Sequence, residues 1–506
     1  MTFRYSRNGL SGTENILQRV FEILPGALSW GVLLGLLLLS FCRPIAAAVV
    51  VIAFDLYWLL RLIYMTIFLM ASYLLLSAER QTDWMQKIRR LKTESNWKEL
   101  YHLVIVPVAK ERREIVEPCI QSLADQKFPS RQILVVLALE ERSESAVQED
   151  ARSVVETYRE KFLDCFLVVH PDNVPGEARV KGANAACAAR EAARRLEKRG
   201  IPFENVVASC FDADTIVSPN YFSCLAYHYL TTPDRTRASF QPIPVYHNNI
   251  WDVPGFARVL DIGASLMQMI EATNPQKLVT FSSHSMSFQA LVEVDFWPVD
   301  MISDDSAIFW KALLHYDGKY QVVPMYVTVS MDVAAAGGWW KTAVNVYRQK
   351  RRWAWGIENF PILMRGFLRS QKISFGTKAR HISKMLESHV MWATGAPILA
   401  VMSWLPALLA GREFSSSVLY YSAPRITRII FHLSFLSLAA TILVSLLLLP
   451  KKKVRNSFVR KAGLALEWLL IPVILILFSS LPALDAQTRL LLGKRMEFWV
   501  TEKRRR

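Results

Sequence analysis

Two strongly apolar stretches, one near each end of the chain, limit the folds open to this sequence more than any other feature. They cover about residues 26–78 and 388–483, whereas residues 80–385 have the mixed polarity of a soluble protein. Residues 26–42 carry no charge, and a second apolar run follows at 45–78. Apolar runs of this kind suit helices that cross a bilayer. The sequence therefore predicts a soluble domain inserted between two groups of transmembrane helices.

Six consecutive parts are expected, and composition excludes two other classes of protein. Charged residues make up only 21% of the chain and aromatic residues 11%, which excludes a disordered protein. The six cysteines contain no Cys-x-x-Cys pair, which excludes a disulfide scaffold. The expected parts are a cytosolic N-terminal segment (1–25), two N-terminal transmembrane helices (26–80), a cytosolic domain (98–358), amphipathic interface helices (361–385), C-terminal transmembrane segments (386–484), and an interface helix with a tail (485–506).

The central part alternates between strand-like and helical patterns. Apolar, β-branched runs predict strands at 101–108, 133–139, 166–169 and 206–211. Helical patterns lie between them at 114–126, 147–161 and 182–199. Strands that alternate with helices of this length indicate an α/β domain with a mostly parallel sheet.

The strongest chemical motif is Asp212-Ala213-Asp214, which directly follows the last of these strands. Ligands bind at the carboxyl ends of the strands in open α/β sheets. Two carboxylates at that edge suit Mg²⁺ or Mn²⁺ bridged to substrate phosphates. The alternative is a turn or capping role, since Asp also favours turns.

Further polar motifs follow other expected strands or open helices. Lys181-Gly182 begins the Ala-rich helix, where free backbone N–H groups favour an anion. The remaining candidates are Pro107 to Glu111 after the first strand, Glu140 after the second, Ser303-Asp304-Asp305, and Gln349-Lys350-Arg351-Arg352-Trp353.

In this order, the motifs resemble those of family 2 glycosyltransferases, specifically the membrane-embedded processive branch that includes bacterial cellulose and hyaluronan synthases. The resemblance covers about residues 103–353 and implies a GT-A-type α/β nucleotide-sugar-binding domain between N- and C-terminal transmembrane helices. It implies four groups of residues: nucleotide-binding Pro107, Glu111, Glu140, Lys181 and Asp212; metal-binding Asp212 and Asp214; catalytic Asp305 with Asp304; and, at the acceptor and pyrophosphate, Gln349, Arg351, Arg352 and Trp353.

The tail carries one more match. Residues 498–503 fit the Phe-x-Val-Thr-x-Lys pattern of the gating loop in cellulose synthases, which folds over the nucleotide after an amphipathic interface helix, expected here at 488–496. The resemblance implies a gating role for Phe498, Val500, Thr501 and Lys503. The alternative is a basic tail that binds anionic lipid.

Three positions depart from the family pattern. Glu140 stands where aspartate is usual, which leaves the nucleobase contact open, and Ser303-Asp304 replaces the commoner Thr-Glu. His284 lies in a stretch that is often Gly-Thr in the family. It either shapes acceptor selectivity or is a hydrogen-bonded structural histidine.

Membrane topology presents a conflict. Apolar segments at 388–409, 429–449 and 464–481, if all three cross the membrane, would place the tail outside. The basic run 451–455 and the basic tail both favour the cytosol. We therefore expect one of the three segments to be re-entrant or interfacial, with 388–409 as the first candidate. Asp55 and Arg61, within the run 45–78, are either a functional pair or an ion pair that locks helices together.

The sequence therefore predicts an inverting, metal-dependent glycosyltransferase in the inner (cytoplasmic) membrane, multi-pass, with its catalytic domain in the cytosol. The expected donor is a nucleoside-diphosphate sugar, UDP-linked, and the acceptor is a growing polysaccharide that is translocated across the membrane. Transfer of one sugar to a polyprenyl phosphate is the alternative. Membrane lipid is an expected partner, a nucleic acid is not, and the sequence does not identify accessory subunits.

Overall fold

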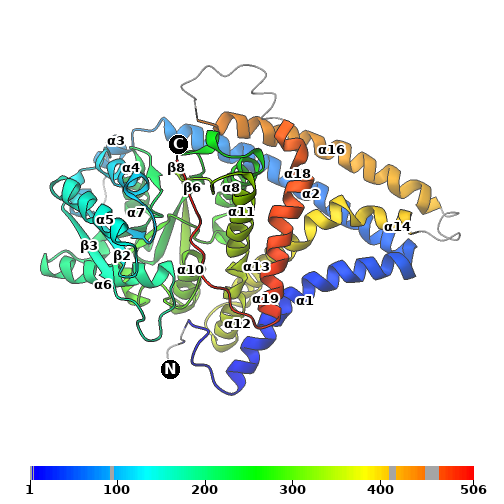
Figure 1. The fold of residues 1–506 in the computed structure, drawn as a ribbon, viewed down its shortest axis with the longest axis horizontal. Helices are drawn as coiled ribbons and strands as arrows, with labels where there is room; N and C mark the ends of the chain where they lie inside the picture. Colours follow the sequence, from blue (N-terminus) through cyan, green and yellow to red (C-terminus); the bar gives the residue numbers. More distant parts are fainter. Residues whose placement is uncertain (1–2, 4, 92–95, 410–417, 451–465, 506) are drawn as a thin grey trace.

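The computed structural model describes residues 3, 5–91, 96–409, 418–450 and 466–505. The molecule has two ends (Figure 1). One is a mixed α/β domain, and the other is a group of long helices that extend away from it. The two apolar stretches of the sequence therefore come together on one side of the domain.

A single eight-stranded sheet forms the centre of the α/β domain. Its strand order is β3-β2-β1-β4-β7-β6-β8-β5. The pairs β1–β2, β2–β3, β1–β4 and β6–β8 are parallel, whereas β7 pairs antiparallel with β4 and β6. The strands are β1 (Tyr101–Val108), β2 (Ile133–Glu140), β3 (Asp164–His170), β4 (Val206–Cys210), β5 (Ile216–Val217), β6 (Ala238–Val245), β7 (Ser285–Ser287) and β8 (Gln321–Ser330).

Helices cover both faces of this sheet. Alternate residues of β1, such as Leu103 and Val104, belong to two different hydrophobic cores, so each strand is buried on both sides. One face packs against α6 (Lys181–Lys198), α9 (Phe288–Glu293) and α10 (Asp304–His315). The other packs against α3 (Trp84–Arg89), α4 (Arg113–Ala124), α5 (Ser145–Tyr158) and α7 (Tyr221–Thr231).

The strands and helices expected between residues 101 and 211 are all present. Their observed ends differ from the expected ones by no more than three residues, as for α5, which ends at Tyr158 before a short 3₁₀ turn. Three further helices lie between the sheet and the long apolar helices (Figure 1): α8 (Gly255–Ala272), α11 (Trp339–Ala354) and α12 (Asn359–Arg369).

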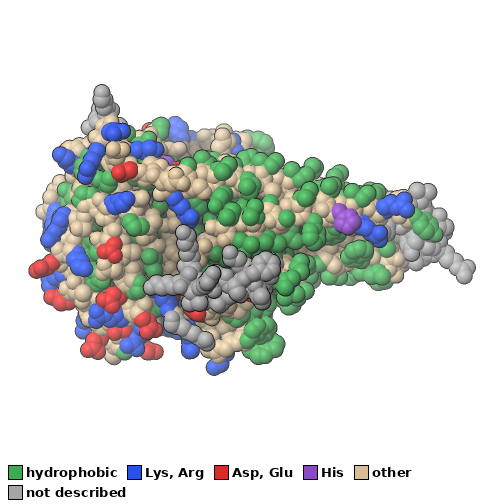
Figure 2. Space-filling view, turned by 90° about the horizontal axis from the view of Figure 1, so that it is seen from above, with side chains coloured by type: hydrophobic (Ala, Val, Ile, Leu, Met, Phe, Trp, Pro, Cys, Tyr) green, Lys and Arg blue, Asp and Glu red, His purple; other side chains and the backbone are tan. Residues whose placement is uncertain are grey.

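Four helices in the described residues are long and apolar enough to cross a membrane, namely Thr13–Cys42, Pro44–Arg80, Arg425–Leu448 and Trp468–Leu491. They correspond to α1 (Thr13–Cys42), α2 (Pro44–Arg80), α16 (Val418–Leu448) and a continuous run ending in α18 (Ile471–Leu475), a π-helical turn and α19 (Leu481–Leu491). The helices α13 (Phe375–Ala400) and α14 (Leu405–Leu408) form a further candidate, bent by 49°. Figure 2 shows hydrophobic side chains over the elongated part of the molecule and charged side chains gathered on the rounded part.

The segment α18–α19 differs in direction from the other candidates. Helices α1, α2, α13–α14 and α16 extend toward the end far from the sheet, whereas α18–α19 runs crosswise along the domain (Figure 1). Glu467 pairs with Arg258 of α8 at 2.6 Å, and Asp485 pairs with Arg351 of α11 at 2.8 Å. These ion pairs hold both ends of the segment against α8 and α11.

The bend of 49° between α13 and α14 fits either a broken span or a re-entrant loop, so the expectation for residues 388–409 stays a prediction. The apolar run Trp468–Leu491 lies crosswise to the other candidate spans (Figure 1) and offers a second way to keep the tail on the side of the sheet. The hydropathy of that run, 2.1, lies within the range of 2.0–2.2 of the four candidate spans, and its ion pairs with α8 and α11 distinguish it from the other three. If α1, α2, α13–α14 and α16 are the segments that cross, the tail lies on the same side of the membrane as the sheet.

Asp55 and Arg61 do not pair with each other, so the expected pair is wrong. Residues six apart on one helix point about 240° apart around its axis. The carboxylate of Asp55 accepts a hydrogen bond from Thr427 of α16 at 3.1 Å. Arg61 instead pairs with Glu387 of α13 at 2.5 Å. Each residue therefore links α2 to a different neighbouring helix.

We predict that α13–α14 crosses the membrane and that α18–α19 lies on its surface. Reporter fusions truncated after Leu409, Pro450 and Arg505 should report the far side, the catalytic side and the catalytic side, respectively. A re-entrant 388–409 segment would reverse the first two results, and three full crossings would move only the last fusion to the far side.

Candidate active site

Acidic side chains gather at the carboxyl end of β4. Asp212 and Asp214 follow β4 directly, and Asp305 lies in the first turn of α10. Ser282 donates a hydrogen bond to Asp212 Oδ2 at 2.6 Å from the segment that precedes β7. Three separate parts of the chain therefore bring oxygen atoms to one edge of the sheet, as the sequence predicted for the Asp-x-Asp motif.

Lys181 joins two of these carboxylates. Its Nζ donates to Asp212 Oδ1 at 2.8 Å and to Asp305 Oδ1 at 3.0 Å. Burial opposes its charge, yet the two carboxylates raise the pKa of Lys181 well above its ordinary value. Burial would likewise neutralise Asp212, but Lys181 and Lys503 hold the pKa of that carboxyl below its usual range. Lys181 and Asp212 therefore each stabilise the charged form of the other.

Asp214 lies deeper and is fully buried. It accepts a hydrogen bond from the backbone N–H of Asp332 at 2.7 Å and one from Lys503 Nζ at 2.5 Å. Arg505 donates to the Asp332 carboxylate at 3.0 Å. Burial and the charge of Asp214 raise the pKa of Asp332 to about 6. The C-terminal tail thus supplies two cations to the acidic edge.

Asp304 and His284 lie behind this edge and are almost fully buried. Burial, with the neighbouring charge of Asp305, raises the pKa of Asp304 to about 8. Burial lowers the pKa of His284 to about 4, so its ring is neutral, and its Nδ1 lies 4.0 Å from Asp305 Oδ1. Asp305 is therefore the member of the Asp304-Asp305 pair that faces the cluster and contacts Lys181.

A cavity of about 750 Å³ adjoins the acidic edge. Glu140, at the end of β2, lines it together with Lys110 and Arg142, and Glu140 forms an ion pair with Arg142. Its lining does not include Asp212, Asp214 or Asp305, which contact Lys181 or Lys503.

Pro107 and Glu111 belong to the first strand and its loop. Pro107 is the penultimate residue of β1, and Glu111 caps the backbone N–H groups of Ala109 and Lys110 at 2.8 and 3.0 Å. Glu111 therefore shapes the loop at the rim of the cavity. No contact between Glu111 and the acidic cluster is present among the described residues.

The side chains of the motif 349–353 on α11 contact two different parts of the structure. Arg352 lies 3.5 Å from Thr501 Oγ1 and has its guanidinium over the Phe498 ring, so it faces the tail. Arg351 instead pairs with Asp485 of α19, and the structure therefore does not bring it to the acidic cluster. The Oε1 atom of buried Gln349 has no hydrogen-bond partner among the described residues.

Trp353 forms an aromatic group with two other rings. Its centroid lies 5.8 Å from that of Phe281 and 6.0 Å from that of Tyr246. Lys350 Nζ lies 3.6 Å from the centre of the Trp353 ring and forms a buried ion pair with Asp261 of α8. These contacts hold the indole in place beside the segment that carries Ser282 and His284.

The tail follows α19 without further helix among the described residues and returns to the sheet (Figure 1). The interface helix expected at 488–496 therefore begins and ends earlier in the chain, because α19 covers Leu481–Leu491. Phe498 and Val500 line the cavity, and Thr501 is only 6% exposed. Asn345 of α11 donates to the backbone oxygen of Glu502 at 2.9 Å, which fixes the chain just before Lys503.

Sequence reasoning missed three residues of the cluster. Asp332 follows the carboxyl end of β8, which was a usable signal of the same kind as that of Asp212. Ser282 and Arg505 carried no such signal, because a serine in a loop and one arginine in a basic tail are common. Their contacts depend on the tertiary arrangement.

Comparison with known proteins identifies the family. Residues 209–479, more than half of the chain, match the family described as "Glycosyl transferase family group 2". The chain belongs to this family and is a glycosyltransferase that uses a nucleotide sugar. Its α/β domain with apolar helices at both ends has the GT-A-type, membrane-flanked architecture that the sequence predicted.

Solved structures give weaker likenesses. A mannosyltransferase from Pyrobaculum calidifontis, PcManGT in complex with GDP-Man and Mn²⁺, is 15% identical with a TM-score of 0.39, over 74% of this chain and 99% of that one. Residues 1–349 of TarS from S. aureus are 12% identical with a TM-score of 0.34, over 67% of this chain and 90% of that one. TM-scores below 0.5 do not define a shared fold. The search of curated proteins found no match to this sequence.

We predict that Asp304 is a protonated structural residue, which Asp304→Asn tests. Folded Asp304 keeps its proton up to about pH 8, whereas the unfolded chain loses it near pH ~4. Between these values the unfolded state binds fewer protons, so stability falls as the pH rises. The melting temperature of Asp304→Asn relative to wild type should therefore increase from about pH 5 to about pH 8, by at least ~2 °C.

The matched control is Asp234→Asn, because Asp234 is exposed. Its melting temperature relative to wild type should not change with pH. An Asp304→Asn protein that becomes relatively less stable with rising pH would mean that the native carboxyl is ionised.

Proposed function

We propose that the chain is an inverting, divalent-metal-dependent glycosyltransferase of the cytoplasmic membrane. It uses a nucleoside-diphosphate sugar, with UDP as the expected nucleotide, and its catalytic domain faces the cytosol. The single observation that carries this proposal is the network in which Lys181 joins Asp212 to Asp305 while Lys503 reaches Asp214. It combines an acidic pair suited to a metal with a separate carboxylate suited to proton transfer.

The acidic pair fits a divalent ion. Asp212 and Asp214 offer carboxylate oxygens, the donors that Mg²⁺ and Mn²⁺ prefer. The ammonium of Lys503 already contacts Asp214 Oδ1 at 2.5 Å, so this position accepts a cation in the present conformation. When bound, the metal would neutralise charge on the leaving diphosphate. Asp214 and Asp212 would hold it.

Asp305 is the proposed general base. The acceptor hydroxyl attacks the anomeric carbon, the bond from that carbon to the diphosphate breaks, and the hydroxyl proton passes to an Asp305 carboxylate oxygen. Lys181 contacts both oxygens of Asp305, at 3.0 and 3.2 Å, and holds the carboxylate in position. Attack opposite the leaving group inverts the configuration at the anomeric carbon.

The cavity is the proposed donor site. Glu140 and Lys110 line its polar wall, and Phe498, Trp499 and Val500 of the tail lie at its other side. Glu111 would hold the loop of β1 in shape rather than touch the nucleotide. Arg352, which faces the tail, would contact the diphosphate, and Trp353 with Gln349 would bind the acceptor sugar.

We further propose that the enzyme is processive and passes its polymer across the membrane. The support is the pairing of the α11 motif with the tail through Arg352 and Thr501, which lie 3.5 Å apart. A second candidate is transfer of one sugar to a polyprenyl phosphate. Incubating the purified chain with a panel of radiolabelled nucleotide sugars, then sizing the product, separates them: a long polymer supports the first and a lipid-linked single sugar the second. Absence of transfer from every donor with Mg²⁺ or Mn²⁺ would contradict both.

We predict that Asp305→Asn retains nucleotide-sugar binding but lowers the catalytic rate by ~10²–10⁴-fold, the usual effect of losing a general base. Binding should be measured by calorimetry, and turnover at saturating donor. The amide keeps the size of the carboxyl but cannot take the proton at neutral pH. Loss of binding with normal saturated turnover would make Asp305 a binding residue.

We predict that Lys503→Gln lowers the catalytic rate at least ~10-fold, because the diphosphate would lose a positioned cation. Arg504→Gln is the matched control: it removes one tail charge as well, but Arg504 pairs with Glu502 at the surface and should keep at least about half of the rate. Equal effects of both substitutions, on activity and on vesicle binding, would instead identify the tail as a lipid anchor.

A further inference from the structure

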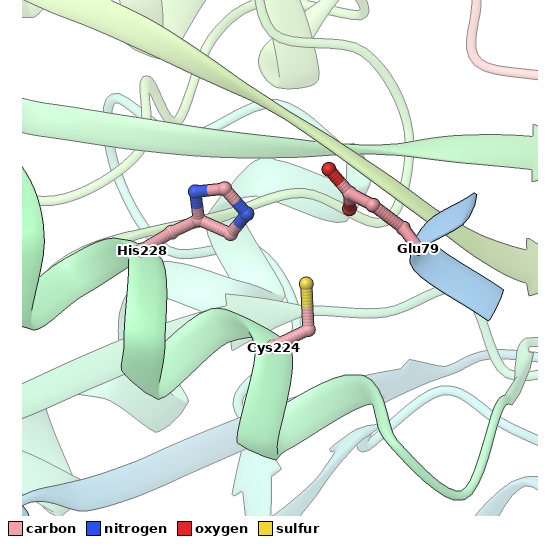
Figure 3. A group of neighbouring side chains, drawn as sticks. All are labelled: Glu79, Cys224 and His228. Atoms are coloured by element: carbon pink, nitrogen blue, oxygen red, sulfur yellow. The ribbon is translucent and has the colours of Figure 1, made fainter. Parts of the chain in front are cut away.

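Glu79, Cys224 and His228 form a compact cluster at the junction of α2 and α7, away from the acidic edge. One donor atom from each residue lies within 4.8 Å of the other two. Figure 3 shows the three side chains pointing toward one another, two from α7 and one from the end of α2. The family reaction does not use these residues, so their arrangement calls for another explanation.

The backbone presents two of the donors in register. Cys224 and His228 are four residues apart on α7 and therefore lie on the same face, one turn apart. Glu79 is at the second-last position of α2, where the backbone N–H of Tyr326 in β8 donates to its Oε2 at 3.1 Å. That hydrogen bond uses Oε2 and orients a carboxylate whose oxygen lies within 4.8 Å of the thiol and the imidazole donors.

The cluster is enclosed. Cys224 is fully buried, and the buried Nε2 of His228 has no hydrogen-bond partner among the described residues. Trp84 of α3 covers the imidazole with ring centroids 5.6 Å apart. Lys87 is the nearby cation, but its Nζ lies over the rings of Trp84 and Tyr227, and no ion pair between it and Glu79 is present among the described residues.

We propose that Glu79, Cys224 and His228 bind a zinc ion. Thiolate, imidazole and carboxylate are the three side-chain ligands that Zn²⁺ takes, and a sulfur with a nitrogen donor excludes Mg²⁺ and Ca²⁺ as natural occupants. Bonds of about 2.0–2.3 Å place tetrahedral ligands about 3.5 Å apart, so small side-chain rotations close the present arrangement. A water molecule takes the fourth position.

Proton balance follows from the present states of the ligands. Burial lowers the pKa of His228 to about 4, so its ring is already neutral. Burial raises the pKa of the Cys224 thiol, which therefore gives up its proton as the metal binds. The ion would tie the end of a membrane helix to a helix of the catalytic domain.

Cobalt spectroscopy tests this site directly. The full-length chain, purified in detergent without a polyhistidine tag and stripped with a chelator, receives Co²⁺ alone. A thiolate-to-cobalt charge-transfer band should appear. Its full intensity should correspond to one thiolate-bound Co²⁺ per chain, and the band should disappear when Zn²⁺ is added. Co²⁺ at Asp212 and Asp214 gives no such band, so the two sites remain distinguishable.

Variants assign the ligands. Cys224→Ser should abolish the band, and His228→Ala and Glu79→Gln should weaken Zn²⁺ binding by at least ~10-fold in competition with a chromophoric chelator. Cys187→Ser, which changes a cysteine of α6, is the matched control and should keep the band. A wild-type protein without the band, or a band that depends on Cys187 instead of Cys224, would overturn the proposal; the wild-type result does not require any variant to fold.

Discussion

The ion pair of Lys181 with Asp212 and Asp305 is the interaction on which the rest of the site depends. Three carboxylates could not remain charged at one edge of a buried sheet without a cation among them. Lys181 is the first residue of α6, Asp212 follows β4 and Asp305 lies in the first turn of α10, so the ion pairs also fix these three elements relative to one another. Lys503 then extends the same network to Asp214 and thereby brings the end of the chain to the middle of the domain.

The crosswise segment α18–α19 explains how the tail reaches that position. Its ion pairs to α8 and α11 hold it along the catalytic side, and the chain leaves α19 close to the cavity. A helix that crossed the membrane instead would deliver the tail to the opposite side. Whether the tail can contribute residues to the active site therefore depends on the membrane topology of this segment.

Much of the fold and part of the site could be predicted from the sequence. Apolar runs in the sequence predict strands β1 to β4. Sequence motifs predict Asp212 after β4, Lys181 at the start of α6 and Asp305 near the start of α10. Local pattern could not reveal that Arg351 pairs with Asp485, because that choice depends on which face of α11 meets α19. Nor could hydropathy show that the run Trp468–Leu491 lies crosswise to the other apolar helices, or link Glu79 to His228 across 149 residues, since such contacts exist only once the chain is folded.

The central claim is that Asp212 and Asp214 hold the metal that accompanies the nucleotide diphosphate. The most direct measurement is electron paramagnetic resonance of Mn²⁺ titrated into the purified protein with and without UDP. The account predicts tight binding of one Mn²⁺ at this site when UDP is present, and its loss in Asp214→Asn with the fold retained. Mn²⁺ binding that is the same in wild type and Asp214→Asn, with UDP bound in both, would contradict it.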